Sequence, residues 1–222
     1  MSFGKNLQYL RQLSAGMTQE TLAEKLNVSR QTISKWEMDA ANPEMDKALE
    51  LCKVFNCSLD NLFRDEMDQR SSAYTNLRVE EVPGFRYVEH TVISTEPESD
   101  ALDRVSKYAK ENGIDHSRVI GWDFPRLSME QINVFKMHGY TAAWILPDGL
   151  VPEGLKVREQ SAHRYAAIHI EHPFDNPFVT IPGAYHTLGD YMRTNGLVQV
   201  ENEVIPCFET DGESMDVYMA CK

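Results

Sequence analysis

The sequence predicts two domains of different fold class, an all-α domain of five helices followed by an α+β domain. Apolar residues recur at helical spacing through the first 66 residues. From residue 78 onward, short apolar segments typical of strands alternate with two amphipathic helices. The stretch 67–77 between them is polar and charged and has no apolar period. We therefore expect an all-α domain over 1–66, a linker over 67–77 and an α+β domain over 78–222.

Composition points to a soluble, globular protein. Of the 222 residues, 42% are hydrophobic and 25% are charged, and this length can bury two modest cores. No apolar run reaches membrane length, and the start MSFGKNLQYLRQ is polar, unlike a signal peptide. We expect a cytoplasmic protein without membrane contact.

Cysteine and histidine spacing favours neither a disulfide nor a metal site. The four cysteines show no CxxC pairing, and two of them lie on apolar stripes, so we expect reduced thiols. His169 and His172 flank Glu171, but on a strand the two histidines would face opposite sides. We expect no metal and no cofactor.

The stretch TQETLAEKLNVSRQTISKWE, residues 18–37, predicts two short helices around a tight turn. Thr18 is a suitable N-cap for the first helix, which has an apolar stripe of Leu22, Ala23 and Leu26. Asn27-Val28 forms the turn, and Ser29 caps the second helix. That helix directs Ile33 and Trp36 inward and presents a polar outer face made of Arg30, Gln31, Ser34 and Lys35. Such side chains pair with base edges and phosphates, so we interpret the stretch as a DNA-reading helix-turn-helix.

The flanking segments complete a five-helix pattern. Apolar spacing predicts a preceding helix from Phe3 to Leu13, a following helix opened by Asn42-Pro43, and a short helix over 58–63. With the run MTQETLAEKLNVSRQTISKWE and the later Pro43, residues 3–63 resemble the phage-repressor-like (XRE) DNA-binding domain. One departure is Asp39, because the family usually has glycine after the WEx triplet.

The resemblance implies a role for each polar residue of the motif. Gln19 and Ser29 would contact phosphates, and the major groove would be faced by Arg30, Gln31, Thr32 and Lys35. Trp36 would pack under the recognition helix, and Glu37 would hold the following loop. Apolar stripes alone would suit any small helical bundle; the outward Arg30-Gln31 pair and the matched turn favour DNA binding.

Charge is distributed unevenly along the chain. The net charge is −12, but the first 66 residues carry 8 Lys and Arg against 10 Asp and Glu, which leaves −10 for the remainder. DNA affinity must then rest on local clustering around the recognition helix, doubled in a homodimer on a palindromic operator. The acidic second domain favours cationic partners, although a solvated acidic surface is the commoner explanation.

The second domain contains an internal repeat of strand, helix, strand and strand. Arg86-Tyr87-Val88 and Arg164-Tyr165-Ala166 each open a strand that precedes an amphipathic helix. The two helices end at Asn-Gly, and each half closes with two strands, predicted over 119–124 and 139–147, and over 204–209 and 215–221. The repeat predicts a pseudo-twofold α+β domain.

A cleft is expected where the two halves meet, and strand alternation predicts its lining. Glu209 shares a face with Ile205 and Cys207, and alignment of the halves gives the equivalent face Ile120, Trp122 and Phe124. A further row comprises Tyr140, Ala142, Trp144 and Leu146. An acid among aromatic rings suits a lipophilic cation. Alternatively, the aromatic rows form plain core and Glu209 reaches water.

A second resemblance concerns this domain. The closing run from Ser161 to Lys222 resembles the second half of the GyrI-like effector-binding domain of multidrug-sensing AraC- and MerR-type regulators. The resemblance implies that Glu209 is the buried acid for cationic ligands and that Tyr218 lies near it. The ligand-binding set we expect is Glu209, Trp122, Phe124, Tyr140, Trp144 and Tyr218. The segment 210–214 is short, which leaves the rim of the pocket open.

These observations favour a ligand-responsive transcriptional regulator that binds double-stranded DNA and a small effector, and has no catalytic residues. A second hypothesis is hydrolysis of reactive small molecules, with Glu209 and Tyr140 in general acid/base roles. A third is a protein-interaction module of the gyrase-binding kind fused to a helix-turn-helix.

Overall fold

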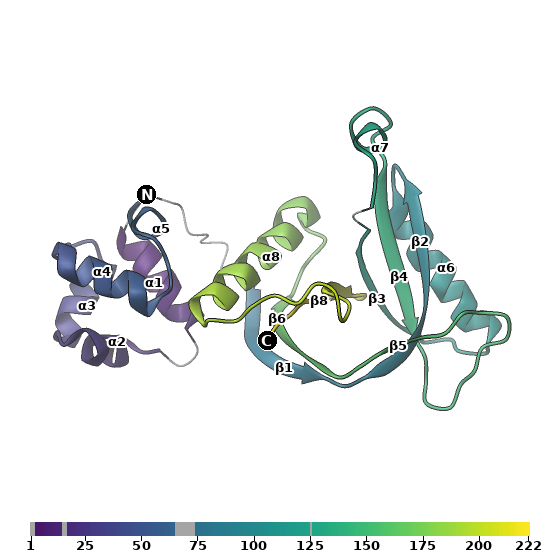
Figure 1. Ribbon diagram of the computed structural model, residues 1–222, viewed down its shortest axis with the longest axis horizontal. Helices are drawn as coiled ribbons and strands as arrows, with labels where there is room; N and C mark the ends of the chain where they lie inside the picture. Colours follow the sequence, from purple (N-terminus) through teal and green to yellow (C-terminus); the bar gives the residue numbers. More distant parts are fainter. Residues whose placement is uncertain (1–2, 15–16, 65–73, 125) are drawn as a thin grey trace. The chain divides into compact units, whose positions relative to one another are not determined.

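The computed structural model describes residues 3–14, 17–64, 74–124 and 126–222 (Figure 1). Contacts divide the chain into two compact units, each built from segments that are not continuous in sequence. The first comprises 1–78, 166–199 and 221–222, and the second comprises 79–165 and 200–220.

Five helices occupy the start of the chain, as the sequence predicts: α1 (Phe3–Leu13), α2 (Gln19–Leu26), α3 (Arg30–Glu37), α4 (Met45–Val54) and α5 (Leu59–Phe63). The hydroxyls of Thr18, Ser29 and Ser58 accept hydrogen bonds from the first-turn amides of α2, α3 and α5. Asn27 ends α2 in the left-handed conformation, with φ at 52°. Local capping chemistry therefore fixes the turn between α2 and α3.

These helices pack through buried apolar side chains, mostly leucines, and through hydrogen bonds at the helix ends. The fully buried side chains include Leu7, Leu10, Leu22, Ile33, Leu51 and Leu62. Lys47 Nζ donates to the carbonyl of Leu26 at 2.9 Å and so satisfies the C-terminal end of α2 from α4. Buried Asn6 donates through Nδ2 to the carbonyls of Asn61 and Leu62, which joins α1 to α5.

The remaining elements alternate strands and helices: β1 (Tyr74–Val82), β2 (Phe85–Ser94), α6 (Pro97–Glu111), β3 (Arg118–Asp123), α7 (Met129–Asn133), β4 (His138–Ile145), β5 (Arg158–Gln160), β6 (His163–Ile170), α8 (Pro177–Thr194), β7 (Cys207–Thr210) and β8 (Met215–Ala220). The strand order of the sheet is β1-β6-β8-β7-β3-β4-β2-β5. The element series β2-α6-β3-β4 recurs as β6-α8-β7-β8, so the predicted α+β repeat is confirmed.

Most predicted strand ends differ from the structure by one or two residues, and two boundaries differ by more. Residues 74–77, predicted to end the linker, form the start of β1, while 67–73 lie outside the described residues. The strand predicted to begin at Val204 begins at Cys207. Across the part of the chain that the structure describes, no helix is long and apolar enough to cross a membrane.

Helix α6 covers one face of strands β2 and β4 in the second unit (Figure 1). Its Ala101, Val105 and Ala109 pack on the sheet against Val88 and the fully buried Trp144. The helix stops at Asn112, and Gly113 follows with φ at 78°. This packing defines a helix-covered face of the sheet and an opposite face.

Asp39 resolves the departure from the family pattern in the loop after α3. It adopts φ of 54°, the conformation that glycine tolerates best, and its Oδ1 accepts a 2.7 Å hydrogen bond from the amide of Gly4. That amide belongs to the first turn of α1 and has no partner within the helix. The carboxylate therefore caps α1, which offsets the backbone strain that a glycine would avoid.

We predict that Asp39→Ala lowers the free energy of unfolding by about 1–2 kcal/mol, because it loses the cap and keeps the unfavourable φ. Asp39→Asn is the matched control, since asparagine retains an oxygen acceptor and tolerates the left-handed region. Urea denaturation followed by circular dichroism measures both. An alanine variant as stable as the parent would contradict the capping role.

Candidate functional site

Helix α3 presents the polar face that its sequence predicts. Ile33 and Trp36 are buried against the other helices. Arg30, Gln31 and Lys35 are exposed, as is the N-cap Ser29, and Thr32 and Ser34 are half-buried. Three long polar side chains thus project from one short, well-anchored helix, which is the arrangement that base-edge reading requires.

Glu37 is buried at the end of α3 and joins three helices. Its carboxylate accepts from Arg11 Nε at 2.6 Å and Nη2 at 3.1 Å, and from Gln19 Nε2 at 2.8 Å. Arg11 lies on α1 and Gln19 opens α2. The prediction that Glu37 holds the following loop is therefore wrong: the loop is held by Asp39, and Glu37 fixes the helices behind α3. Gln19 is oriented by this network, and its phosphate contact stays a prediction.

The pairing of β3 with β7 places Glu209 on the helix-covered face of the second unit. Glu209 is opposite Gly121, and Gly121 is opposite Ala142 of the core beneath α6. Directly paired residues of antiparallel strands share a face. Trp122 alternates to the other face, so the predicted alignment of Trp122 and Phe124 with Glu209 is wrong. In the structure, Asp123 shares the helix-covered face with Glu209, and Trp122 shares the opposite face with Phe208.

Tyr140 lies beside Glu209 on that face. The ring of Tyr140 lies over Gly121, because a Cβ added at Gly121 would meet the tyrosine hydroxyl at 2.0 Å. Burial raises the pKa of Tyr140, as do the carboxylates of Glu209, Glu98, Asp123 and Asp211. The hydroxyl thus stays protonated at neutral pH in a strongly acidic neighbourhood.

Three of these acids were not predicted as site residues. Asp123 is opposite Tyr140 in the β3–β4 pair, Glu98 lies in the first turn of α6, and Asp211 follows β7. Desolvation raises the pKa of Glu98, and the charges of Asp123 and Asp211 raise it further. Among the described residues, no group of His, Cys, Asp or Glu could hold a metal ion. The strand glycine at 121 was the available signal, since such glycines mark close approach by another group.

The opposite face of the sheet carries the other predicted aromatics. Trp122 meets the edge of Tyr87 at a centroid distance of 6.5 Å. Tyr218 stacks on Phe208 at 4.5 Å, and its hydroxyl donates to Glu80 at 3.0 Å. Because Phe208 alternates with Glu209, the prediction that Tyr218 lies near Glu209 is wrong. Phe124 likewise packs against Gly139, away from Tyr140.

Trp144 is a core residue that also borders a cavity. It is fully buried beneath α6, and its Nε1 has no hydrogen-bond partner among the described residues. A cavity of about 660 Å³ reaches Trp144 and is lined by polar residues that include Arg86, His116, Arg118 and Asp148. None of the carboxylates around Tyr140 lines this cavity. The acidic cluster and this cavity are therefore separate features.

Comparison with known proteins identifies the first part of the chain. A helix-turn-helix family model matches residues 7–62. The uncharacterized HTH-type transcriptional regulator MJ0272 of Methanocaldococcus jannaschii is 40% identical over 63 residues, covering 28% of this chain and 94% of that protein. The chain belongs to the helix-turn-helix family of transcriptional regulators.

Two further proteins are similar to this chain. The HTH-type transcriptional regulator ImmR of Bacillus subtilis (strain 168) is 40% identical over 72 residues, so the chain spans about half of it, 56%, and 32% of this chain is covered. A cryo-EM structure of an EcmrR–DNA complex has a TM-score of 0.49 and 13% identity, covering 96% of this chain and 80% of that chain.

We predict that Gly121→Ala lowers the free energy of unfolding by about 2–3 kcal/mol, because the methyl group would overlap the ring of Tyr140. On a Tyr140→Ala background the same change should cost much less, since the ring is gone. Gly189→Ala in α8 is the control, because nothing lies within 4 Å of its added Cβ. Urea denaturation of the four variants gives the coupling; additive costs would contradict the close approach.

Proposed function

We propose that this protein is a ligand-responsive transcriptional regulator that reads operator DNA with α3. The observation that carries the proposal is the exposed face of α3, where Arg30, Gln31 and Lys35 project while Ile33 and Trp36 anchor the helix. Arginine and glutamine form paired hydrogen bonds with guanine and adenine edges in the major groove. Thr32 and Ser34, half-buried on the same helix, would supply shorter contacts.

Phosphate contacts would come from the starts of α2 and α3. Gln19 and Ser29 lie at these two helix N-termini, where unpaired amides and the helix dipole favour anions. Such contacts position the recognition helix without reading sequence.

We propose that the protein binds as a homodimer on a palindromic operator. The first 66 residues carry a net charge of −2, so one helix-turn-helix offers few favourable phosphate contacts, and a second doubles them. Two recognition helices would then enter successive major grooves about 34 Å apart.

The effector we propose is a small lipophilic cation held at Glu209 and Tyr140. The charges of four carboxylates, those of Glu209, Glu98, Asp123 and Asp211, act on the buried Tyr140, and the charges of Asp123 and Asp211 also act on Glu98. A monovalent cation would offset this negative charge, and the face of the tyrosine ring would add cation–π attraction. Trp122, Phe124 and Tyr218 face away from this cluster and Trp144 is core, so we assign the charge recognition to Glu209.

Hydrolysis is the weaker alternative. The acidic neighbourhood raises the pKa of Tyr140, which opposes its use as a general base near neutral pH. The matched relatives are transcriptional regulators. A cation that stabilises the protein without being hydrolysed would favour the regulator over the hydrolase. Retention of another protein on the immobilised chain would favour the protein-interaction module.

We predict that Arg30→Ala and Gln31→Ala each reduce discrimination between the selected operator and a mismatched duplex by about 10- to 100-fold, since each base contact contributes roughly 1–3 kcal/mol. Fluorescence anisotropy at one fixed salt concentration measures both duplexes. Lys53→Ala, on α4, is the control for a change of charge alone. Unchanged discrimination in both α3 variants would reject the assignment of α3.

The proposed dimer predicts two protomers on one palindromic duplex. Sedimentation velocity should show a 2:1 complex, and a duplex with one half-site should bind at least about tenfold more weakly because half of the phosphate contacts are lost. A single protomer bound with full affinity would refute the dimer.

For the effector, we predict that Glu209→Gln weakens tetraphenylphosphonium binding by about tenfold or more, because glutamine keeps the volume and removes the charge. Tetraphenylborate is the matched probe, since it has nearly the same shape and the opposite charge; the parent should prefer the cation, and the variant should lose that preference. Titration calorimetry measures both.

The control for this prediction is Glu213→Gln, which removes an exposed carboxylate near β8. It should leave the preference for the cation intact. Equal losses for both probes in Glu209→Gln, or none for either, would mean that Glu209 is not the acid of the site.

A further inference from the structure

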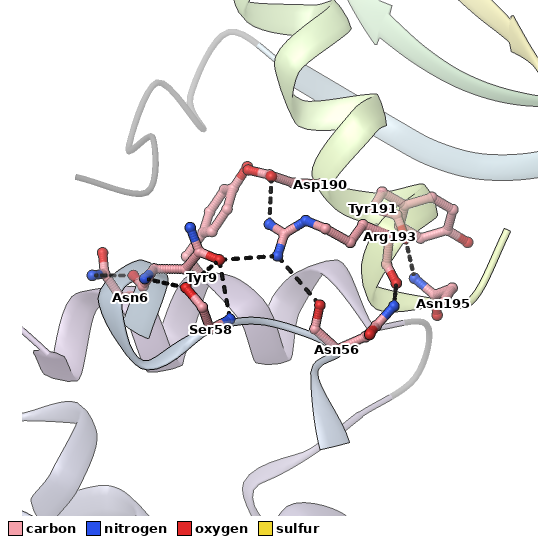
Figure 2. A network of polar contacts seen from close by, with 9 residues as sticks. Asn6, Tyr9, Asn56, Ser58, Asp190, Tyr191, Arg193 and Asn195 are labelled. Atoms are coloured by element: carbon pink, nitrogen blue, oxygen red, sulfur yellow. Dashed lines mark hydrogen bonds and ion pairs between the residues drawn. The ribbon is translucent and has the colours of Figure 1, made fainter. Parts of the chain in front are cut away.

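The C-terminal turn of α8 is hydrogen-bonded to the helix-turn-helix (Figure 2). Both belong to the first compact unit. Asn56, in the loop between α4 and α5, donates through Nδ2 to the carbonyl of Arg193 at 2.7 Å. In return, Arg193 Nη1 donates to the carbonyl of Asn56 at 3.3 Å and to Asn61 Oδ1 at 3.4 Å. The two segments, 137 residues apart in sequence, thus bond in both directions.

Arg193 is oriented for this contact by its own helix. Its Nη2 forms a 2.7 Å ion pair with Asp190 Oδ1, one turn earlier on α8. The carbonyl that Asn56 binds lies in the last turn of α8, where it also accepts a hydrogen bond from the amide of Gly196 at 3.3 Å. A side chain of the helix-turn-helix therefore adds a second donor to the C-terminal end of α8.

Helix α1 adds two longer contacts from the other side. Tyr9 Oη donates to Asp190 Oδ2 at 3.5 Å, and Asn195 Nδ2 donates to the carbonyl of Leu13 at 3.5 Å. Figure 2 shows Tyr9 and Asp190 directed toward each other, and Asn195 beyond the end of α8. The contact therefore joins α8 to three parts of the helix-turn-helix, namely α1, the loop before α5 and α5 itself.

Cys57, next to Asn56, provides a chemical probe of this contact. Its side chain is half-buried, and burial, followed by the charge and hydrogen bond of Cys52, raises the pKa of the thiol to about 12. The charge of Arg193 acts in the opposite direction. The rate at which this thiol is alkylated therefore responds to changes at the end of α8.

We propose that the end of α8 is the switch contact of the protein: Arg193, Asn195 and Asp190 hold the helix-turn-helix through Asn56 and α1, and effector binding acts on DNA affinity by making or breaking this contact. The second half of the proposal rests on the proposed function. The contact consists of a few hydrogen bonds, each worth about a factor of 2 to 12 in equilibrium, so a ligand of ordinary affinity could shift it.

Alkylation of Cys57 tests the contact without any ligand. The full chain is treated with iodoacetamide, and peptide mass spectrometry measures the rate at Cys57. Arg193→Ala should raise that rate about tenfold, because loss of the bonds exposes the thiol. His186→Ala, at an exposed position of the same helix, should leave it unchanged. Circular dichroism confirms that both variants are folded; Arg193→Gln, with a shorter polar side chain, provides a second variant.

Coupling to DNA is measured with tetraphenylphosphonium and a duplex selected by the parent protein from a random library. In the parent and in His186→Ala, the cation should change the affinity for the duplex at least about fivefold. In Arg193→Ala, the change should fall below about twofold. Calorimetry should show that Arg193→Ala binds the cation as the parent does. An unchanged alkylation rate, or full coupling in Arg193→Ala, overturns the proposal. If the parent does not bind the cation, the proposed effector is wrong, and the alkylation rate alone decides whether the contact exists.

Discussion

The pairing of Gly121 with Glu209 across β3 and β7 determines on which face of the sheet each functional side chain of the second unit lies. Because side chains alternate along a strand, this one pair directs Asp123 and Glu209 toward Tyr140 and turns Trp122 and Phe208 away. The absence of a Cβ at Gly121 leaves room for the tyrosine ring. Asp123 and Glu209 thereby share a face with Tyr140, and Trp122 and Phe208 lie on the other face.

The helix-turn-helix depends on a comparable constraint, the buried carboxylate of Glu37. A buried charge is costly unless its hydrogen bonds are satisfied, and Arg11 and Gln19 supply three of them. The network fixes α1 and α2 behind the recognition helix, while Asp39 closes the next loop by capping α1. These hydrogen bonds fix the orientation of α3 relative to α1 and α2. Reading of base edges depends on that orientation.

Much of this architecture could be predicted from local sequence, because its causes are local. The caps at Thr18 and Ser29, the turn at Asn27 and the spacing of the apolar stripes each act within a few residues, and the predicted helices match the structure. The strand-helix-strand-strand repeat was readable for the same reason. Strand register could not be predicted from local sequence, because it depends on which distant residues pair. An alignment shifted by one residue reverses every side chain.

That error shows why the site could be predicted only in part. Glu209 and Tyr140 were predicted as site residues with aromatic neighbours, whereas the structure places the carboxylates of Glu98, Asp123 and Asp211 near Tyr140; their role in ligand binding stays a prediction. Likewise, Glu37 was expected to act on its neighbours in sequence, yet its main partner Arg11 lies 26 residues away. Residue type and local spacing indicate candidate functional side chains, whereas long-range pairing determines which of them lie close together.

The division into compact units adds a mechanical argument. Both β1 and β6 pass from one unit to the other within a strand, and α8 shares a unit with the helix-turn-helix although it belongs to the α+β repeat. Helix α8 holds the helix-turn-helix through a few hydrogen bonds at one end. In the proposed switch, this contact at Arg193 is the one that effector binding changes.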